Sequence, residues 1–375
     1  MTRKILVVFG TRPEAIKLCP VVRYMRNEPN FRVSVCATGQ HLEMLQQVLD
    51  VFQVEPDHRL GLMLPGQTLF QSTSRILAGL EQVLQSDKPD MVLVQGDTTT
   101  TLCGALAGFY AGVPVGHVEA GLRTGNVRSP FPEEMNRVLT TRLSALHFAA
   151  TEQSADNLRR EGIADQAIEV TGNTGVDAVL QTAALLESGR IASKLDALDQ
   201  SRKLIVVTAH RRESFGDGFE RICQALARIA ERDDVEIVYP VHPNPNVQNV
   251  VKRVLSERAN IKLLTPLDYV SFVDLMRRSY LLLTDSGGVQ EEGPSFGKPV
   301  LVMRDNTERP EAVQAGTASL VGTDVERIVG AVEQLLDDGE EHGRRSRIHN
   351  PYGDGRASER ITGAVKQYLA GSLGF

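Results

Sequence analysis

Residues 91–121, MVLVQGDTTTTLCGALAGFYAGVPVGHVEAG, contain the pattern from which a fold class follows. Two nearly continuous apolar runs, 91–95 and 113–118, flank a segment, 100–110, whose apolar residues recur with the spacing of a helix face. Continuous apolar runs are typical of parallel strands that are covered by helices on both faces. The stretch therefore predicts a strand, a helix and a second strand parallel to the first.

The same alternation recurs on both sides of this stretch. We expect further strands at 5–9, 32–37, 147–150, 168–170, 204–208, 236–240, 261–264, 280–284 and 299–303, and helices at 15–26, 42–49 and 68–84. The alternation pauses at residues 171–173, and the polar segment 187–203 follows after a helix-like stretch, so we predict domains at 1–172 and 173–356 and a final amphipathic helix at 357–375. Both domains of this α/β protein are expected to be doubly wound. The ligand is then expected at the carboxyl ends of the strands, in the cleft between the domains.

The composition argues against several functional classes. The net charge of −6 argues against a nucleic-acid-binding surface, because phosphate contacts require clustered Lys and Arg. No apolar run approaches the ~18 residues that a membrane span needs. The cysteines stand apart in apolar surroundings without a zinc-like spacing, so we expect buried free thiols, no metal and a cytoplasmic protein.

The loop after the first strand carries two cations. Gly10 allows a sharp turn and Pro13 suits the first turn of a helix, while Arg12 and Lys17 add positive charge there. Backbone N–H groups at a helix start, together with these cations, favour an anion-binding site. A solvated helix start with surface charges is the alternative. The absence of a G-x-G-x-x-G pattern in this loop argues against a dinucleotide.

Carboxylates follow the next strands along the chain. Asp97 comes directly after the strand that opens the quoted stretch, and Glu119 comes after the strand that closes it. If these strands are neighbours, the two carboxylates face one crevice, which is typical of general acid–base pairs. Helix capping by Asp97 or Thr98 is the alternative. Glu133 and Glu134 open a further helix, where the helix dipole alone would explain one acidic residue.

In the second half, polar and small residues again follow strands. His210 and Arg211 come after one predicted strand, and His242 comes after the next. The strongest pattern is TDSGG, residues 284–288, where a strand leads into a helix through small residues. Such a junction favours close approach of a diphosphate to backbone N–H groups. Glu292, one helical turn further on, is expected beside a ribose.

These segments stand together in the order of one known family. The chain resembles the non-hydrolysing UDP-N-acetylglucosamine 2-epimerases in FGTRPEAIK, TGQH, QGDTTT, HVEAGLRT, PEEMNR, HRRESFG, VHPNPNV, LTDSGGVQEE and RDNTERPE. The motifs extend from Phe9 to Glu311, so the resemblance covers most of the chain. It implies the GT-B fold, with two Rossmann-like domains and a last helix that crosses back to the first domain. It also implies a homodimer that uses no cofactor.

The resemblance also implies an activity. Members of the family interconvert UDP-GlcNAc and UDP-ManNAc by inverting C2 of the sugar, which supplies ManNAc units for cell-surface polysaccharide. The family route eliminates UDP to give 2-acetamidoglucal and adds UDP back after protonation on the other face. An epimerase for a UDP-2,3-diacetamido sugar, a GT-B glycosyltransferase and a non-catalytic UDP-sugar sensor would each share part of these motifs. The carboxylates of the first domain favour an epimerase.

Site residues are implied by position within the matched motifs. The acid–base carboxylates are then Asp97, Glu119 and Glu133, with His210 assisting near the diphosphate. The implied UDP-binding residues are Arg12, Lys17, Phe272, Ser286, Gly287, Gly288, Glu292 and Arg309. Many bacterial members hold a second, activating UDP-GlcNAc, whose site here would comprise Gln40, His41, Gln67, Glu134, Arg211 and His242. Leu267 stands where some members carry Gln near the uracil, so backbone groups would read the base there.

Overall fold

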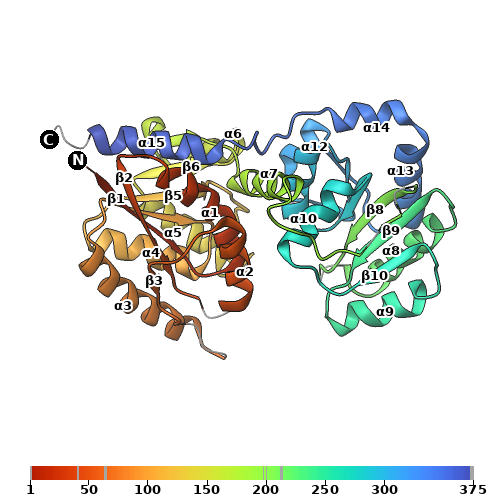
Figure 1. Ribbon diagram of the computed structural model, residues 1–375, viewed down its shortest axis with the longest axis horizontal. Coiled ribbons are helices and arrows are strands. Elements are labelled where there is room, and N and C mark those ends of the chain that lie inside the picture. Colours follow the sequence, from red (N-terminus) through yellow and green to blue (C-terminus); the bar gives the residue numbers. More distant parts are fainter. Residues whose placement is uncertain are drawn as a thin grey trace. The chain divides into compact units, whose positions relative to one another are not determined.

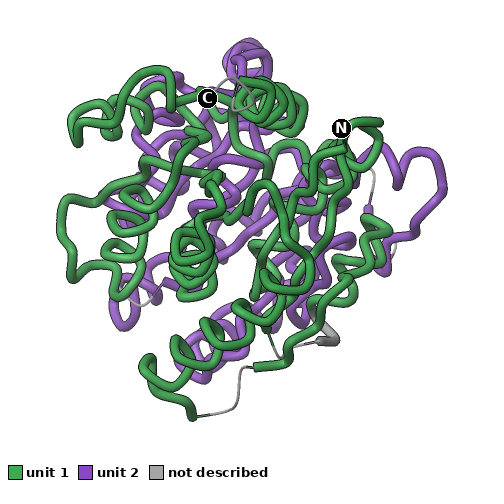
Figure 2. The backbone as a smooth tube through the Cα atoms, turned by 90° about the vertical axis from the view of Figure 1, so that its left-hand side faces the viewer, with its two compact units in different colours: residues 1–181, 352–375 green, residues 182–351 purple. Residues whose placement is uncertain are grey.

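The computed structural model describes residues 2–39, 42–62, 66–196, 198–199, 201–211 and 214–371, with the backbone alone at 42–44. The chain forms two compact units, which we call unit 1 (residues 1–181 and 352–375) and unit 2 (residues 182–351) (Figure 2). The expected division at 172/173 precedes the observed one because a single helix, α7 (Thr174–Glu187), continues from unit 1 into unit 2. Residues 352–356 belong to unit 1, where the N–H of Asn173 donates to the carbonyl of Tyr352 at 2.7 Å.

Unit 1 is built on a parallel sheet of seven strands in the order β3-β2-β1-β4-β5-β6-β7 (Figure 1). The strands are β1 (Arg3–Phe9), β2 (Phe31–Ala37), β3 (His58–Arg59), β4 (Met91–Gln95), β5 (Val115–Ala120), β6 (Leu146–Ala149) and β7 (Ile168–Val170). The helices are α1 (Arg12–Arg26), α2 (Leu42–Phe52), α3 (Leu69–Asp87), α4 (Thr99–Tyr110), α5 (Glu133–Leu143), α6 (Glu152–Arg160) and α15 (Ala357–Gly371). The strand order reverses between β1 and β4, and ligands of doubly wound sheets bind at such a switch point.

Unit 2 repeats this architecture with six parallel strands in the order β10-β9-β8-β11-β12-β13. The strands are β8 (Lys203–Thr208), β9 (Val235–Pro240), β10 (Ile261–Leu264), β11 (Leu281–Thr284), β12 (Val300–Val302) and β13 (Ala318–Leu320). The helices are α8 (Asp217–Ile229), α9 (Pro245–Leu255), α10 (Tyr269–Arg278), α11 (Gly287–Glu292), α12 (Pro310–Ala315), α13 (Val325–Asp337) and α14 (Gly339–Ser346). Here the order reverses between β8 and β11, which places the second switch point.

The predicted α/β class with two parallel sheets is confirmed, and the differences have local causes. β3 and β13 were not predicted because His58–Arg59 has no apolar residue and Ala318–Leu320 has no β-branched or aromatic one. β5 begins at Val115 rather than 113 because Pro114 has no N–H for a sheet ladder. β5 also continues to Ala120, so Glu119 lies within the strand and not beyond it.

The C-terminal helix is part of unit 1. α15 packs beside α1, and the carbonyl of Leu369 accepts a hydrogen bond from Arg3 at 3.1 Å (Figure 1). The buried carboxylate of Asp177 receives the N–H groups of Ala357 and Ser358, at 3.1 and 2.8 Å, at the start of α15. This contact joins the beginning of α7 to the returning chain.

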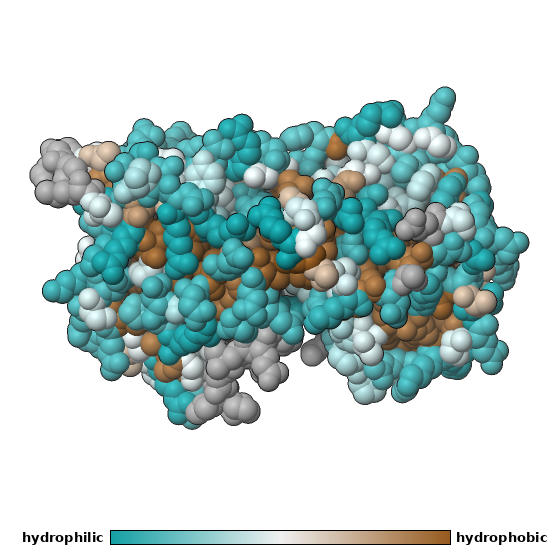
Figure 3. All heavy atoms as spheres, in the orientation of Figure 1, coloured by the Kyte–Doolittle hydropathy of each residue, from teal (hydrophilic) through white to brown (hydrophobic). Residues whose placement is uncertain are grey.

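Hydrophilic residues cover most of the face shown in Figure 3, with apolar residues between them. Among the helices in the described part of the chain, none is long and apolar enough to cross a membrane. The cysteines Cys19, Cys36, Cys103 and Cys223 are all free and buried, as their apolar surroundings predicted.

Candidate functional site

The candidate residues of unit 1 lie at the carboxyl ends of three adjacent strands, β1, β4 and β5. Arg12 opens α1 after β1, Asp97 follows β4, and Glu119 lies near the end of β5. β4 and β5 pair in parallel up to Gln95 and Val118, so the two carboxylates emerge from neighbouring strand ends, as expected. The residues that hold each carboxylate differ.

Glu119 has an unusual backbone conformation. Its φ of 62° lies in the left-handed region, and the pairing of β5 with β6 shifts register between Val118 and Ala120. A non-glycine residue pays roughly 1–3 kcal/mol for such a conformation, and residues of this kind cluster at functional sites. The carboxylate receives Lys17 Nζ at 2.5 Å and the side-chain amide of Gln95, with only 12% of the side chain exposed.

Asp97 is held by a buried arginine. The Nε and Nη2 of Arg137 donate to Asp97 Oδ2 at 2.9 and 2.7 Å, and Asn136 donates to the Asp97 carbonyl at 2.8 Å. Thr98, not Asp97, caps α4, because the Thr98 hydroxyl accepts the N–H of Thr101. The capping alternative is therefore wrong for Asp97. Its carboxylate, 29% exposed, faces Arg137 on one oxygen only.

Arg137 joins Asp97 to a second, buried carboxylate. Its Nη1 donates to Glu134 at 2.6 Å, and Glu134 also accepts the N–H groups of Thr124 and Gly125 at 2.9 and 3.1 Å. The side chain of Glu134 is 2% exposed, so in this conformation it holds Arg137 and the 124–125 loop. Its neighbour Glu133 is half-buried in the first turn of α5, and its side chain has no hydrogen bond to another described residue.

The start of α1 is organised by a residue to which sequence reasoning assigned no role. The buried carboxylate of Glu14 accepts the N–H groups of Gly10 and Thr11, at 3.1 and 2.7 Å, and the hydroxyls of Thr98 and Thr101, at 2.7 and 3.2 Å. Burial raises the pKa of Glu14, against the effect of these hydrogen bonds. The Thr-x-x-Glu spacing at residues 11–14 is typical of a capping box, and it is the sequence signal for this role of Glu14.

This arrangement corrects the anion site expected at the start of α1. Glu14 occupies the N–H groups of Gly10 and Thr11, and Lys17 faces Glu119. An anion there would be held by the guanidinium of Arg12, which has no ion-pair partner among the described residues. The capping carboxylate also ties the loop after β1 to the loop that carries Asp97.

A buried histidine supports the Asp97 loop from within the sheet. His117 lies in the middle of β5, and its Nε2 is 2.8 Å from the carbonyl oxygen of Gly96. Burial lowers the pKa of His117 to about 3, so the neutral ring donates to this carbonyl at neutral pH. Gly96 has a φ of 75°, a conformation that glycine adopts without strain. A polar residue within an apolar strand was the sequence signal for this role.

In unit 2, the candidate histidines lie beside each other. The rings of His210 and His242 stack with centroids 5.4 Å apart and an interplanar angle of 11°. Asp285, 1% exposed, accepts the N–H groups of His210 and Arg211, at 2.6 Å each. Burial lowers the pKa of His210, while the nearby Asp285 carboxylate opposes the change.

The glycine pair lies at the junction of β11 and α11. Gly287 is buried against the guanidinium of Arg309, and Gly288 is exposed near the carboxylate of Glu292. Arg309 forms a charged hydrogen bond with Glu291, and Gln290 accepts the hydroxyl of Thr307 at 2.7 Å. These contacts join the Arg309 loop to α11, so the structure brings the predicted diphosphate and ribose candidates of unit 2 together.

Other predicted residues are less closely grouped. Phe272 is half-buried on α10, Leu267 precedes that helix, and Gln67 donates to the carbonyl of Leu62 at 3.2 Å. Gln40 and His41 lie outside the described residues. Within the described ranges, His, Cys, Asp and Glu side chains form no cluster able to hold a metal ion.

Comparisons with known proteins agree with this geometry. A sequence profile for the family described as UDP-N-acetylglucosamine 2-epimerase matches residues 23–366. The chain is 56% identical over 369 residues to the UDP-N-acetylglucosamine 2-epimerase of Escherichia coli strain K12, covering 97% of this chain and 98% of that protein. It is 55% identical over 374 residues to a probable UDP-N-acetylglucosamine 2-epimerase of Ralstonia solanacearum, covering 98% and 100%.

A solved structure extends the likeness to three dimensions. The crystal structure of UDP-GlcNAc 2-epimerase from Neisseria meningitidis bound to UDP-GlcNAc matches with a TM-score of 0.88 and 45% identity. The match covers 97% of this chain and 100% of that chain, so both units are included. The expected GT-B fold is thereby confirmed. The sequence and structural matches both span nearly the whole chain, which belongs to the UDP-N-acetylglucosamine 2-epimerase family.

Proposed function

We propose that this protein interconverts UDP-GlcNAc and UDP-ManNAc by inverting C2 of the sugar. The observation that carries the proposal is the pair of carboxylates at adjacent strand ends, each held by its own cation: Asp97 by Arg137, and Glu119 by Lys17. The C2–H bond of the sugar is not acidified by a neighbouring carbonyl, so direct deprotonation would be too slow. Elimination of UDP to 2-acetamidoglucal, followed by re-addition, avoids this carbanion.

The proposed route needs an acid or base on each face of the sugar and positive charge on the departing UDP. Asp97, Glu119 and Glu133 supply the proton-transfer groups. Arg12 in unit 1 and Arg309 in unit 2 supply positive charge, Lys17 holds Glu119, and Ser286 to Gly288 offer backbone groups to the diphosphate. The substrate and product are isomers, so the reaction has no net oxidation and needs no redox cofactor.

Incubation of the purified protein with UDP-GlcNAc alone tests this function. We expect UDP-ManNAc to form until both sugars are at equilibrium, and in D₂O the proton at C2 is replaced by deuterium. The absence of turnover without an acceptor sugar would contradict an epimerase and favour a glycosyltransferase. A parallel assay with a UDP-2,3-diacetamido sugar checks whether the N-acetyl sugar is the preferred substrate.

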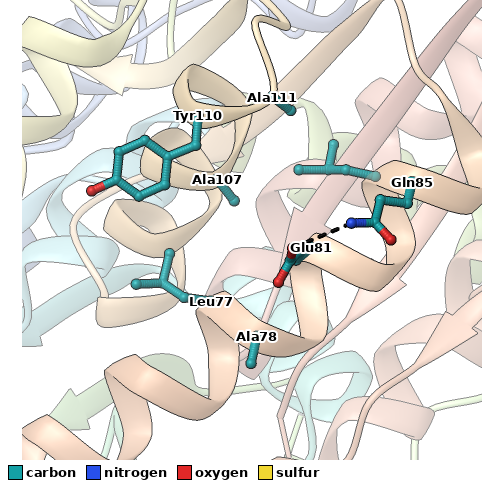
Figure 4. A pocket seen from close by; sticks show the side chains of 8 residues that line it. Leu77, Ala78, Glu81, Gln85, Ala107, Tyr110 and Ala111 are labelled. Carbon is teal, nitrogen blue, oxygen red and sulfur yellow. Dashed lines mark hydrogen bonds between the residues drawn. The ribbon is translucent and has the colours of Figure 1, made fainter.

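We also propose a homodimer, supported by an apolar face on unit 1. Phe70 on α3 and Phe109 and Tyr110 on α4 are 88%, 60% and 74% exposed, whereas large apolar patches are rare on monomers. Tyr110 also lines a hollow of about 690 Å³, whose other lining residues are Leu77, Ala78, Glu81, Leu84 and Gln85 from α3 and Ala107 and Ala111 from α4 and its end (Figure 4). Light scattering should show the mass of two chains, and a single-chain mass at micromolar concentration contradicts this proposal.

Regulation by a second UDP-GlcNAc and a cytoplasmic location stay proposals. Regulation is supported by three polar residues that lie near strand or helix ends, Gln67, Arg211 and His242. A sigmoidal dependence of the initial rate on UDP-GlcNAc concentration tests it. Four free cysteines support the cytoplasmic location, because thiols persist in a reducing compartment. Fractionation of the source cells tests the location.

A further inference from the structure

A buried carboxylate in unit 2 has no part in the mechanism described so far. Asp285 follows β11, and its Oδ2 accepts both backbone N–H groups of His210 and Arg211. Its Oδ1 has no hydrogen bond in the described part of the chain, and the Nδ1 of His210 lies 3.3 Å from it. Asp285 therefore faces both the backbone and the imidazole of the same histidine.

The proton on His210 determines whether this oxygen is satisfied. A buried acceptor without a hydrogen bond costs about 1–3 kcal/mol. A neutral imidazole has one N–H, and placing it on Nδ1 lets a small rotation satisfy Oδ1 while Nε2 becomes the acceptor. The stacked ring of His242 restricts the tilt of the imidazole, whose side chain remains 41% exposed.

We infer that Asp285 is a positioning residue for His210, holding Nδ1–H toward its carboxylate so that Nε2 is the nitrogen presented to substrate. The inference rests on the proposed epimerase function, in which His210 assists near the diphosphate. Orientation of a histidine by a buried aspartate is a general device, since it sets both the tautomer and the direction of the ring.

The charged groups around the His210 ring determine the direction in which its pKa changes when the charge of Asp285 is removed. Burial lowers the pKa of His210, His242 and Arg211 lower it further, and Asp285 raises it. Removing the negative charge of Asp285 therefore lowers the pKa of His210. The limb of the pH–rate profile that belongs to His210 should move to lower pH.

Asp285→Asn tests the inference with little change of shape. The amide oxygen can still accept the N–H groups of His210 and Arg211, while its NH₂ faces Nδ1 and drives the imidazole proton to Nε2. We expect kcat to fall by about 100-fold, within the range of a lost general acid–base contact, with KM nearly unchanged. Calorimetry with UDP should show nearly unchanged affinity, which separates this effect from unfolding.

A double-mutant cycle distinguishes positioning from an independent structural role. In a His210→Asn background, Asp285→Asn should add less than about threefold, because residues that act as a unit are not additive. Glu236→Gln is the matched control: this buried carboxylate of β9 also accepts a backbone N–H, that of Asp199 at 3.1 Å, and should leave the pH profile unchanged. Additive losses, or near-normal turnover by Asp285→Asn, would overturn the inference.

The unsubstituted protein offers a test that does not depend on variant folding. The ¹⁵N chemical shifts of His210 should show the proton on Nδ1 at neutral pH, and a proton on Nε2 would overturn the inference. Absence of epimerase activity in the unsubstituted protein would instead contradict the proposed function. The tautomer can be measured in either case, so the two failures are distinguishable.

Discussion

Asp97→Asn abolishes epimerisation and leaves UDP binding measurable. The amide cannot exchange a proton with the sugar, and loss of one general acid–base group lowers rates by roughly 10²–10⁴-fold. The amide oxygen of this variant can still accept from Arg137, so the surrounding contacts are largely kept. Turnover is measured with UDP-GlcNAc, and UDP affinity by calorimetry.

Asp90→Asn is the matched control for this prediction. Asp90 lies just before the other end of β4, pairs with Arg3 at 2.8 Å, and has a side chain 31% exposed, against 29% for Asp97. Its loss removes the same charge from the same unit, so near-normal turnover is expected. Near-normal turnover by Asp97→Asn itself would remove Asp97 from the mechanism.

Arg137→Leu should strongly destabilise the protein. The Arg137 side chain is 9% exposed and lies between Asp97 and the nearly inaccessible Glu134. Removing one partner of a buried ion pair leaves an uncompensated charge and costs about 3–5 kcal/mol. The free energy of unfolding from urea titration at pH 7 measures the loss, if unit 1 unfolds as one transition.

Arg159→Leu controls for the number of ion pairs. Arg159 contacts Glu152, Asp156 and Asp165, but its side chain is 41% exposed, and exposed ion pairs contribute little. The urea midpoint of this variant should hardly change. Arg137→Lys keeps a positive charge and should fall between Arg137→Leu and the unsubstituted protein. Equal midpoints for Arg137→Leu and Arg159→Leu would contradict the argument from burial.

Much of the site was predictable because parallel sheets place their strand ends at one edge. The apolar run 91–95 located Asp97, and the TDSGG junction located the glycine pair, without knowledge of their partners. Glu119 was also found, but its left-handed backbone and its place inside β5 were not. A bulge depends on pairing with β6, which periodicity along one strand does not encode.

Apolar periodicity and small residues at strand ends established the two parallel sheets and the loops that carry polar side chains, because burial and backbone freedom are local properties of a sequence. Local patterns in the sequence do not determine which of those side chains pair with one another. Arg137 meets Asp97 across 40 residues, Lys17 meets Glu119 across 102, and the N–H of His210 meets Asp285 across 75. Only folding brings such groups within hydrogen-bonding distance. The contacts that form then fix the orientation of each acid, base and cation.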